Sequence, residues 1–254
     1  RQAGLTPCCV VATVGTTSST AIDPLRPIGQ IAGRYDLWLH VDAALAGSAA
    51  ILPEMRWLLD GLELCHSFVF NPHKWMGVNF DCSAFFCREP EVLIRTMAID
   101  PEYLKTDRDR QVTNYRDWGI QLGRRFRALK LWFVLRFYGV EGLQRMLREH
   151  LELAREFKGW VVDSPDFELL APVPLQTVCF RYNPGDLDEA QLDEKNKALM
   201  DEVNRSGRIF ISHTRLDGKL TLRLSVGQIH TRRIHVEQAW QALRESGVVS
   251  NNPG

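Results

Sequence analysis

Residues 67–74 read Ser-Phe-Val-Phe-Asn-Pro-His-Lys and join a short apolar run to a proline-led turn that carries a lysine. The run at 67–70 is continuously apolar, which is typical of a strand covered on both faces of a parallel sheet. Proline restricts the residue before it, so Asn71 is expected to be extended. The segment therefore predicts a buried strand whose carboxyl end delivers Lys74 to one edge of a sheet.

The same pattern continues on both sides of this segment. Apolar runs predict strands at 8–13, 37–41 and 83–87, and the stretches at 24–32 and 53–59 are typical of helices. Strand and helix alternate, as in a parallel sheet with helices on both of its faces. The continuous apolar character of residues 8–12 further predicts that the first strand lies in the interior of the sheet.

The second half of the chain predicts a smaller α+β domain. Apolar residues recur every three to four positions from 122 to about 157, which predicts a long helix, and Gly139 and Gly142 are expected to divide it. The elements expected after it are strands at 167–170, 177–182, 208–213 and 220–226 and helices at 187–203 and 231–245. We expect an α/β fold, with a larger domain at 1–135 and a small C-terminal α+β domain at 136–254.

Composition excludes several classes of protein. Apolar residues make up 45% of the 254 positions, as in a folded globular protein, and 31 basic residues balance 31 acidic ones, which removes a general attraction to nucleic acid. The longest apolar stretch, 129–140, contains two basic residues and is shorter than the roughly 20 residues of a membrane span. The six cysteines lack metal-binding spacing, so we expect them to be reduced core residues of a cytoplasmic protein.

An acid and a lysine are expected to meet at one edge of the predicted sheet. Asp42 directly follows the strand at 37–41, and Lys74 follows the strand at 67–70. Carboxyl ends of parallel strands face a common ligand crevice, so both side chains should reach the same place. A pyridoxal phosphate (PLP) enzyme requires such a pair, with the lysine bonded to the cofactor and the carboxylate at its ring nitrogen. A structural ion pair is the alternative, and spacing alone favours it.

Weaker candidates surround this pair. His73 could contact a cofactor phosphate or ring, although a lone histidine is more often a hydrogen-bonded core residue. The turn at 15–17, Gly-Thr-Thr, could present backbone N–H groups and hydroxyls to a ligand. Residues 100–119 form a long polar stretch without periodicity, which is typical of a functional or disordered loop. The arginines at 124, 125 and 127 begin a helix, so we interpret them as structural rather than as a nucleic-acid patch.

Several ordered motifs resemble the group II PLP-dependent amino-acid decarboxylases, and most of all the aromatic-L-amino-acid decarboxylases. The motifs are ATVGTT at 12–17, HVDAA at 40–44, NPHKW at 71–75, NFDCSA at 79–84, DPEYL at 100–104 and LGRRFR at 122–127. The resemblance implies the fold-type I, aspartate aminotransferase-like fold of PLP-dependent transferases. Residues 1–135 would then be the C-terminal part of the PLP-binding large domain, and 136–254 the small domain.

The resemblance also assigns roles to single residues. Lys74 matches the lysine that forms a Schiff base with PLP, Asp42 matches the partner of the pyridine nitrogen, and His73 matches a further catalytic residue. Asn71 and His73 match neighbours of the phosphate and the lysine. The positions that match the lining of the cofactor are Thr17 and Ala44.

Two positions bear on the reaction that the resemblance implies. Tyr103 matches the tyrosine of a mobile loop that closes over the substrate, and its hydroxyl would return a proton to the product. Related enzymes that make aromatic aldehydes typically have phenylalanine there, so the tyrosine favours simple decarboxylation. Arg223 could bind a substrate carboxylate by analogy with other enzymes of this fold, but we interpret it as a structural ion-pair residue.

The implied activity is the conversion of an aromatic L-amino acid to its amine and CO2. The resemblance implies a homodimer with the active site at the subunit interface, with no nucleic-acid or membrane partner. Chains of that family are about twice as long, so we expect this chain to be an incomplete portion, completed by a companion chain or cut from a longer one. The alternatives are an aromatic aldehyde synthase, a glutamate or histidine decarboxylase, and a non-catalytic pseudoenzyme fragment.

Overall fold

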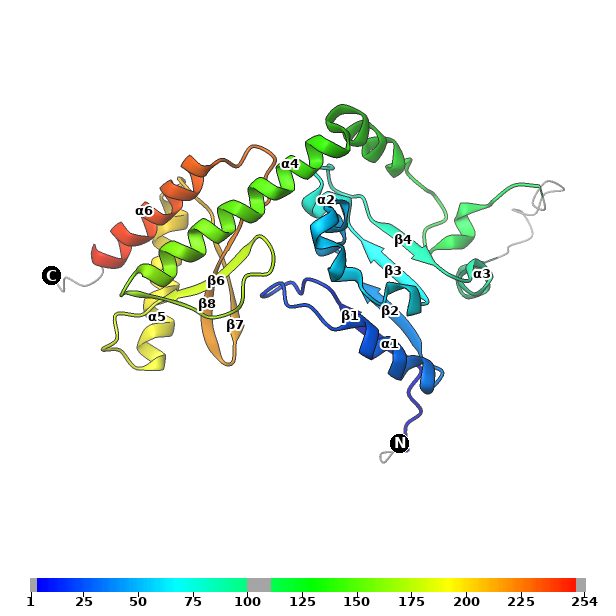
Figure 1. Cartoon of the computed structure of the whole chain (residues 1–254), viewed down its shortest axis with the longest axis horizontal. Helices are drawn as coiled ribbons and strands as arrows, with labels where there is room; N and C mark the ends of the chain where they lie inside the picture. The colour runs from blue at the N-terminus through cyan, green and yellow to red at the C-terminus, as the bar shows by residue number, and fades with distance from the viewer. Residues whose placement is uncertain (1–3, 100–110, 250–254) are drawn as a thin grey trace.

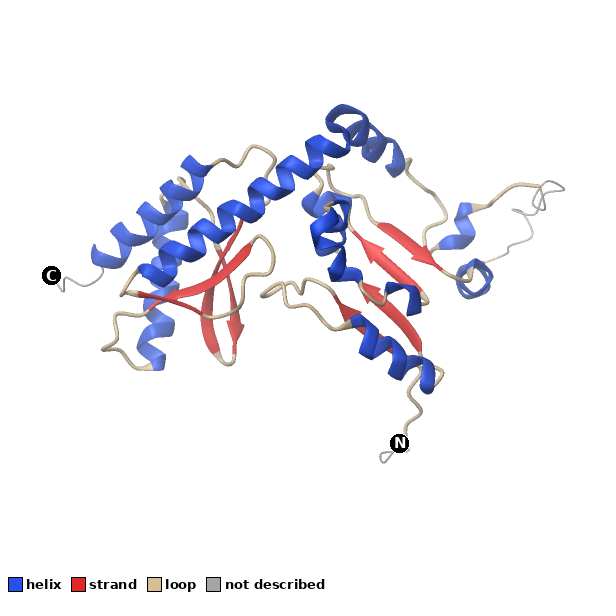
Figure 2. Cartoon of the chain, viewed as in Figure 1, coloured by secondary structure: helices blue, strands red, loops and turns tan. Residues whose placement is uncertain are grey.

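The computed structural model describes residues 4–99 and 111–249, which form two lobes that share one long helix (Figure 1). Each lobe is built around a four-stranded sheet, with strand order β1-β2-β3-β4 in the first and β5-β6-β8-β7 in the second. Strands and helices are distributed over both lobes, as Figure 2 shows. No helix within the described ranges is both long and apolar enough to cross a membrane.

The first sheet is mostly parallel. Strands β1 (Cys9–Thr13), β2 (Trp38–Asp42) and β3 (Ser67–Phe70) run parallel, and β4 (Ala84–Cys87) pairs antiparallel with β3. The other elements of this part are α1 (Leu25–Arg34), η1 (Ala46–Ile51), η2 (Pro53–Leu59), η3 (Leu62–Leu64), α2 (Pro72–Trp75), α3 (Pro90–Met97) and η5 (Tyr115–Trp118). The helix expected at 53–59 is present, but as a 3-10 helix.

Helices cover one face of this sheet. Leu39 and Val41 are fully buried beneath a core to which α1, η1 and η2 contribute apolar side chains. On the opposite face Val11 is 58% exposed and Phe85 50%. The expectation of two covered faces and of an interior first strand is therefore wrong for the described residues. Strand β1 lies at an edge, because β2 is its only partner among them.

The second sheet is antiparallel throughout. It contains β5 (Phe167–Leu169), β6 (Thr177–Tyr182), β7 (Ser212–Leu216) and β8 (Lys219–Ser225), and the helices α5 (Glu189–Arg205) and α6 (Arg233–Val249) belong to the same lobe. The strand expected at 208–213 is displaced toward the C-terminus. Strand β7 instead forms a hairpin with β8 through Asp217 and Gly218, both with positive φ, which is the usual role of an Asp-Gly pair.

Helix α4 (Arg127–Asp163) connects the two lobes and belongs to both cores. Its backbone is non-helical at Gly139 (φ 64°, ψ 174°), so the expected interruption is confirmed there, whereas Gly142 remains helical. Beyond Gly139 the helix buries Leu147 and Leu151 in the core of the first sheet and Phe157 in that of the second. The assignment of 1–135 and 136–254 to two domains stays a prediction.

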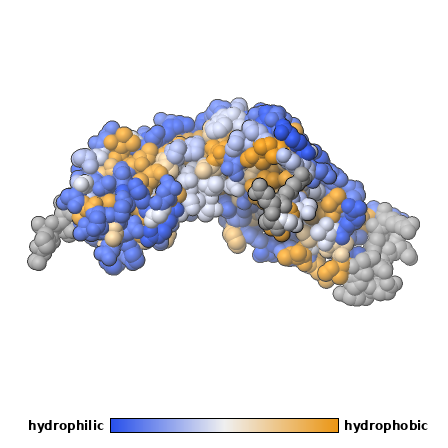
Figure 3. Space-filling model, turned by 90° about the horizontal axis from the view of Figure 1, so that it is seen from below, coloured by the Kyte–Doolittle hydropathy of each residue, from blue (hydrophilic) through white to orange (hydrophobic). Residues whose placement is uncertain are grey.

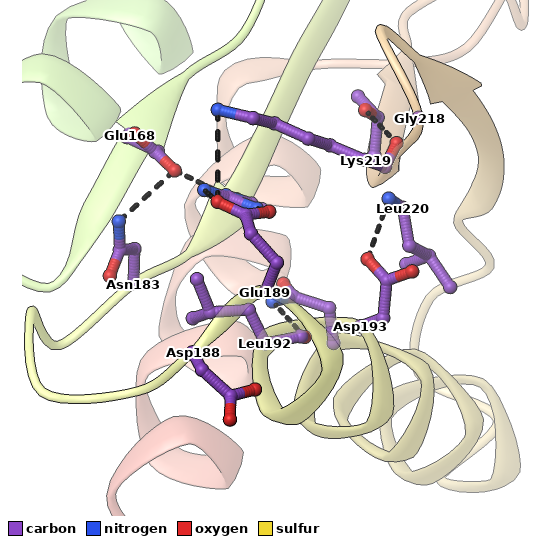
Figure 4. Close-up of polar contacts among 12 residues, drawn as sticks. Glu168, Asn183, Asp188, Glu189, Leu192, Asp193, Gly218, Lys219 and Leu220 are labelled. Carbon is purple, nitrogen blue, oxygen red and sulfur yellow. Dashed lines mark hydrogen bonds and ion pairs between the residues drawn. The ribbon is translucent and has the colours of Figure 1, made fainter.

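A polar cluster that includes Glu168, Asn183, Glu189 and Lys219 connects elements of the small lobe (Figure 4). Arg181 on β6 is 2% exposed and donates to Glu168 on β5 and to both carboxylate oxygens of Glu189, at 2.8 and 3.2 Å, at the start of α5. Asn183 also donates to Glu168, at 3.1 Å. The hydrogen bond from Arg181 lowers the pKa of Glu189, and Lys219 lies 3.9 Å from the same carboxylate. The cluster therefore joins two strands and a helix through charge.

All six cysteines are free thiols. Cys65, Cys82 and Cys179 are buried, as expected of core residues, and burial raises the pKa of each thiol. Cys8 and Cys9 are exposed, so the core expectation is wrong for them. They lie at the beginning of the edge strand, where little packs against them.

Candidate active site at the carboxyl ends of the parallel strands

The three parallel strands end in register. Asp42 pairs with Thr13 of β1 on one side and with Val69 of β3 on the other. The ladder continues past the strand ends, because the Val14 amide donates to the Asp42 carbonyl at 2.8 Å and the Ala43 amide to the Val69 carbonyl at 3.0 Å. The sheet therefore brings Asp42 and the segment before Lys74 to one edge, as the sequence predicted.

The Asp42 carboxylate is half-buried, and among the described residues only one of its oxygens has a hydrogen-bond donor. Its Oδ1 accepts a hydrogen bond from the Ala44 amide at 2.9 Å, while the Ala44 carbonyl accepts one from the Asn71 amide at 2.9 Å. Alternation along β2 puts Asp42 on the same face as His40. Burial lowers the pKa of His40, and the nearby Asp42 charge opposes that shift. Asp42 is thus oriented by backbone and keeps its second oxygen for another group.

Lys74 is presented by the short helix α2. Pro72 occupies the first helical turn, where its missing N–H is not needed, and the Lys74 amide donates to the Asn71 carbonyl at 2.9 Å. The neighbouring Trp75 is fully buried, whereas the Lys74 side chain is exposed. Over the described ranges, neither Lys74 nor Asp42 takes part in an ion pair. The structural ion pair that spacing favoured is therefore wrong.

Residues 80–83 support the start of α2. Nδ1 of His73 lies 2.6 Å from the Cys82 carbonyl oxygen and 3.0 Å from the Cys82 amide, and the ring meets Phe80 edge-on at 4.8 Å. The Ser83 hydroxyl donates to Oδ1 of Asn71 at 2.7 Å. These contacts fix the orientation of His73 and Asn71 beside Lys74, and they use Nδ1 of His73 rather than Nε2.

The turn that follows β1 is closed on itself. The amides of Gly15 and Thr16 both donate to the Ala21 carbonyl, at 2.9 and 3.0 Å, and the Thr16 hydroxyl accepts from the Ala21 amide at 3.0 Å. The Gly15 and Thr16 amides are therefore used within the turn and are not open to a ligand, in contrast to the sequence-based expectation. Thr17 is exposed at the tip of the turn and remains the candidate there.

Arg223 holds this turn from the small lobe. It donates to the carbonyls of Thr17 and Ser18, each at 2.7 Å, and to the Ser212 hydroxyl at 2.9 Å. The ion pairs of the described residues do not include Arg223, so its interpretation as an ion-pair residue is wrong. Its three contacts use Nε, Nη1 and Nη2, so Arg223 connects the carbonyls of this turn to strand β7 of the small lobe.

The remaining arginine and tyrosine predictions have different outcomes. Arg125 and Arg127 pair with Asp81 at 2.7 and 3.0 Å, and Arg124 donates to the Tyr115 carbonyl at 3.1 Å, which confirms their structural role. Tyr103 lies outside the described residues, so its role stays a prediction.

One group beside the site was missed in the sequence. His150 on α4 is fully buried and accepts a hydrogen bond from the indole of Trp75, the residue after Lys74. A signal was present, because His150 stands three residues after Leu147 and four before Ala154, within the apolar stripe of the helix.

The donor set at this edge fits a phosphorylated pyridine aldehyde. An amine without an ion-pair partner can bond covalently to an aldehyde, and a carboxylate with one free oxygen can hold a proton on a ring nitrogen. Lys74 and Asp42 supply these two groups. The side chains available for a phosphate are Thr17, Asn71 and His73, and the Ala44 methyl group offers a small apolar contact beside Asp42.

Comparison with known proteins supports this assignment. The model of the pyridoxal-dependent decarboxylase conserved domain matches residues 1–183. Tyrosine decarboxylase 2 of Arabidopsis thaliana is 48% identical over 95% of this chain and 45% of its own length. Phenylacetaldehyde synthase of the same plant is 46% identical over 96% of this chain and 50% of its own. The chain therefore spans about half the length of the curated relatives it matches.

A solved structure shows the same fold. The crystal structure of Oryza sativa TDC with PLP and tryptamine superimposes with a TM-score of 0.94 and 39% identity, over 99% of this chain and 52% of that one. This likeness bears out the fold-type I, aspartate aminotransferase-like architecture predicted from the sequence. With the family model matching most of the chain, the chain belongs to the pyridoxal-dependent decarboxylase family.

Proposed function

We propose that this chain contributes the lysine site of a PLP-dependent enzyme that converts an aromatic L-amino acid to its amine and CO2. The observation that carries the proposal is the placement of Asp42 and of the turn that carries Lys74 at one sheet edge, where neither residue forms an ion pair with described residues. When bound, PLP supplies an electron sink for the bond that breaks at the substrate Cα.

The residues of the chain have separable tasks in this proposal. Lys74 would hold the cofactor aldehyde through its amine. Asp42 keeps a proton on the ring nitrogen, and the Ala44 amide fixes the direction of its carboxylate. His73, oriented by its contacts with Cys82, presents its other ring nitrogen toward the phosphate or the lysine. Tyr103 returns a proton to Cα of the product.

The substrate class rests on the relatives. Besides tyrosine decarboxylase 2, a solved Catharanthus roseus tryptophan decarboxylase in complex with L-tryptophan matches with a TM-score of 0.88 and 40% identity. Both names describe decarboxylases of aromatic amino acids. We therefore place the substrate in this class without choosing among its members.

An aromatic aldehyde synthase is the second candidate, because phenylacetaldehyde synthase, at 46% identity, is nearly as similar as tyrosine decarboxylase 2, at 48%. Such an enzyme converts the amino acid, O2 and water to the aldehyde, CO2, ammonia and hydrogen peroxide. Tyrosine at position 103 supports decarboxylation, since the aldehyde-forming relatives that the sequence resembles typically have phenylalanine there.

The proposal includes the molecular context. We propose a homodimer with the site at the subunit interface, a cytoplasmic location, and a division into a PLP-binding portion at 1–135 and a small domain at 136–254. The proposed contact with a second subunit is supported by exposed aromatic side chains in the N-terminal part of α4, namely Trp132, Phe133 and Phe137.

A product assay tests the proposed reaction. The full protein is incubated with PLP and L-tyrosine, L-tryptophan, L-phenylalanine or L-Dopa, with L-glutamate as the control substrate. We expect amine and CO2 in equal amounts, with neither ammonia nor hydrogen peroxide. Aldehyde with peroxide would establish the second candidate instead, and turnover of glutamate alone would overturn the aromatic assignment.

A further inference from the structure

A buried hydrogen-bonded chain links the helix that carries Lys74 to the small lobe. The indole Nε1 of Trp75 lies 3.0 Å from Nδ1 of His150, and Nε2 of His150 lies 3.1 Å from the Gln228 carbonyl oxygen. Trp75 and His150 are both fully buried. The three residues come from α2, α4 and the loop between β8 and α6, so these two hydrogen bonds connect three separate elements.

The partners fix the protonation of His150. An indole N–H can only donate, so Nδ1 of His150 must be the acceptor, and a carbonyl can only accept, so Nε2 must carry the proton. His150 is thus a neutral imidazole with one defined tautomer. A second proton would put an N–H at Nδ1 directly against the indole N–H and break the link.

A second contact joins the same segments independently. Gly77, three residues after Lys74, has a φ of +68°, and a Cβ built on it would lie 2.5 Å from Cδ1 of Ile229, the neighbour of Gln228. The backbone after α2 therefore rests directly on the β8–α6 loop. Met76 and Val78, on either side of Gly77, pack against Leu143 of α4.

We propose that His150 is a positioning residue of the lysine site, which acts through Trp75 to hold α2, and with it Lys74, in register with α4 and the small lobe. This inference rests on the proposed role of Lys74. Trp75 directly follows Lys74 in a helix of only four residues, so a displacement of the indole moves the lysine backbone as well. An apolar side chain at position 150 could fill the space but could not set the direction of the indole.

The matched variants are His150→Gln and His150→Leu. Glutamine can accept from Trp75 through its carbonyl oxygen and donate to Gln228 through its amide, whereas leucine can do neither. In the full chain with PLP and borohydride, we expect His150→Leu to slow reductive labelling of Lys74 about tenfold or more, since small misplacements of a reacting group have large effects. We expect His150→Gln to stay within about threefold of the unmodified chain.

A control for general destabilisation is Leu153→Ala, which opens a cavity in the small-lobe core one turn away. It should lower the melting temperature without slowing the labelling of Lys74. Trp75→Phe removes the donor while keeping an aromatic ring, and serves if His150→Leu does not fold. In 15N NMR spectra, the unmodified chain should show the neutral Nε2–H tautomer of His150.

The outcomes separate the two hypotheses. Labelling of Lys74 that is slowed by His150→Leu or Trp75→Phe, restored by His150→Gln and unaffected by Leu153→Ala supports the positioning role. Labelling at an equal rate in all variants overturns the positioning role and leaves the proposed function standing. Absence of labelling at Lys74 in the unmodified chain, both alone and with the remaining half of a relative supplied, overturns both, because there is then no cofactor lysine to position.

Discussion

The Asp42 carboxylate gives one oxygen to the Ala44 amide and has no ion-pair partner among the described residues. Asparagine keeps that hydrogen bond through its carbonyl oxygen but carries no charge for a protonated ring nitrogen. We expect Asp42→Asn to lower kcat about a hundredfold or more while Lys74 still forms its covalent adduct with PLP.

Steady-state kinetics and mass mapping of the same preparation measure the two effects. The matched control is Asp23→Asn, since Asp23 accepts from the Thr13 amide at 2.8 Å at the same end of the sheet. That variant should keep its kcat. Wild-type turnover in Asp42→Asn would show that Asp42 is not the partner of the ring nitrogen.

Arg181 allows a test of stability at a single buried charge. Replacing it by methionine keeps the apolar stem but removes the hydrogen bonds to Glu168 and Glu189, whose partly exposed carboxylates can turn to water. We expect Arg181→Met to lower the free energy of unfolding by about 2 kcal/mol, as measured by urea denaturation.

Arg215→Met is the control for Arg181, because Arg215 forms a surface ion pair with Asp193 at 2.7 Å. Surface pairs contribute little, so the midpoint of its denaturation curve should hardly move. Equal effects of the two substitutions would mean that burial does not distinguish the Arg181 cluster.

The sequence predicted correctly the position of residues that directly follow a strand. It did not predict the contacts of residues whose hydrogen-bond partners are backbone groups. The sequence predicted that Asp42 and Lys74 lie at one edge, because the carboxyl ends of parallel strands meet at the same edge of a sheet. Arg223 was misassigned because its acceptors, the Thr17 and Ser18 carbonyls, lie more than 200 residues away and have no side-chain signature. The closure of the turn onto the Ala21 carbonyl was hidden for the same reason.

Among the elements, α4 has a titrating group in its buried stripe. Burial lowers the pKa of His150 below its ordinary value of 6.5, and Arg232 of the β8–α6 loop lowers it further, while the Gln228 carbonyl and Glu149 on α4 oppose the shift. The residue that faces His150 from α2 is Trp75, which does not titrate.

The sign of the pH effect follows from this shift. Below pH 6.5 the unfolded chain binds a proton at His150 before the folded chain does, so stability falls as the pH falls through 6.5 toward the folded pKa. We expect the melting temperature to drop between pH 7.5 and 5.5, and to drop less in His150→Gln. An identical drop in both would show that His150 does not contribute.

Element boundaries were predicted well where periodicity was strong and poorly where turn chemistry decided. The strands at 67–70 and 177–182 agree with the structure at both ends. The strand at 208–213 was misplaced because its apolar residues were weighed more heavily than Asp217 and Gly218, whose positive φ values form the hairpin turn. The interruption of α4 was predicted from Gly139.

For the molecule as a whole, the uncovered face of the first sheet is the feature with the clearest consequence. Val11 on one edge strand and Phe85 on the other are half or more exposed, and apolar residues lie on the surface of this lobe in Figure 3. Exposed apolar edge strands promote pairing with other chains. We expect the 254-residue chain on its own to self-associate in sedimentation experiments.

Charge at the two edges should reverse this behaviour. The double variant Val11→Lys and Phe85→Lys is expected to shift the chain toward the monomer without loss of helical circular dichroism. The control is Val162→Lys, which adds charge at an exposed apolar position of α4 away from the sheet. A monodisperse monomer formed by the unmodified chain would contradict the expectation.

The two-faced covering of the sheet could not be judged from the sequence, because apolar runs such as 67–70 indicate only that a strand is suited to burial. Whether a face is covered depends on which other segments of the polypeptide pack against it. The relatives are about twice as long as this chain, so the chain supplies one part of a site whose remaining walls the sequence could not place.

The most direct test of the account is borohydride reduction in the presence of PLP, followed by peptide mass mapping. The predicted result is a phosphopyridoxyl adduct on Lys74, lost in Lys74→Arg and kept in Asp42→Asn. The measurement should be made on the chain alone and with the remaining half of a relative supplied in trans. Absence of an adduct on Lys74 under both conditions would contradict the assignment of this edge of the sheet as a cofactor site.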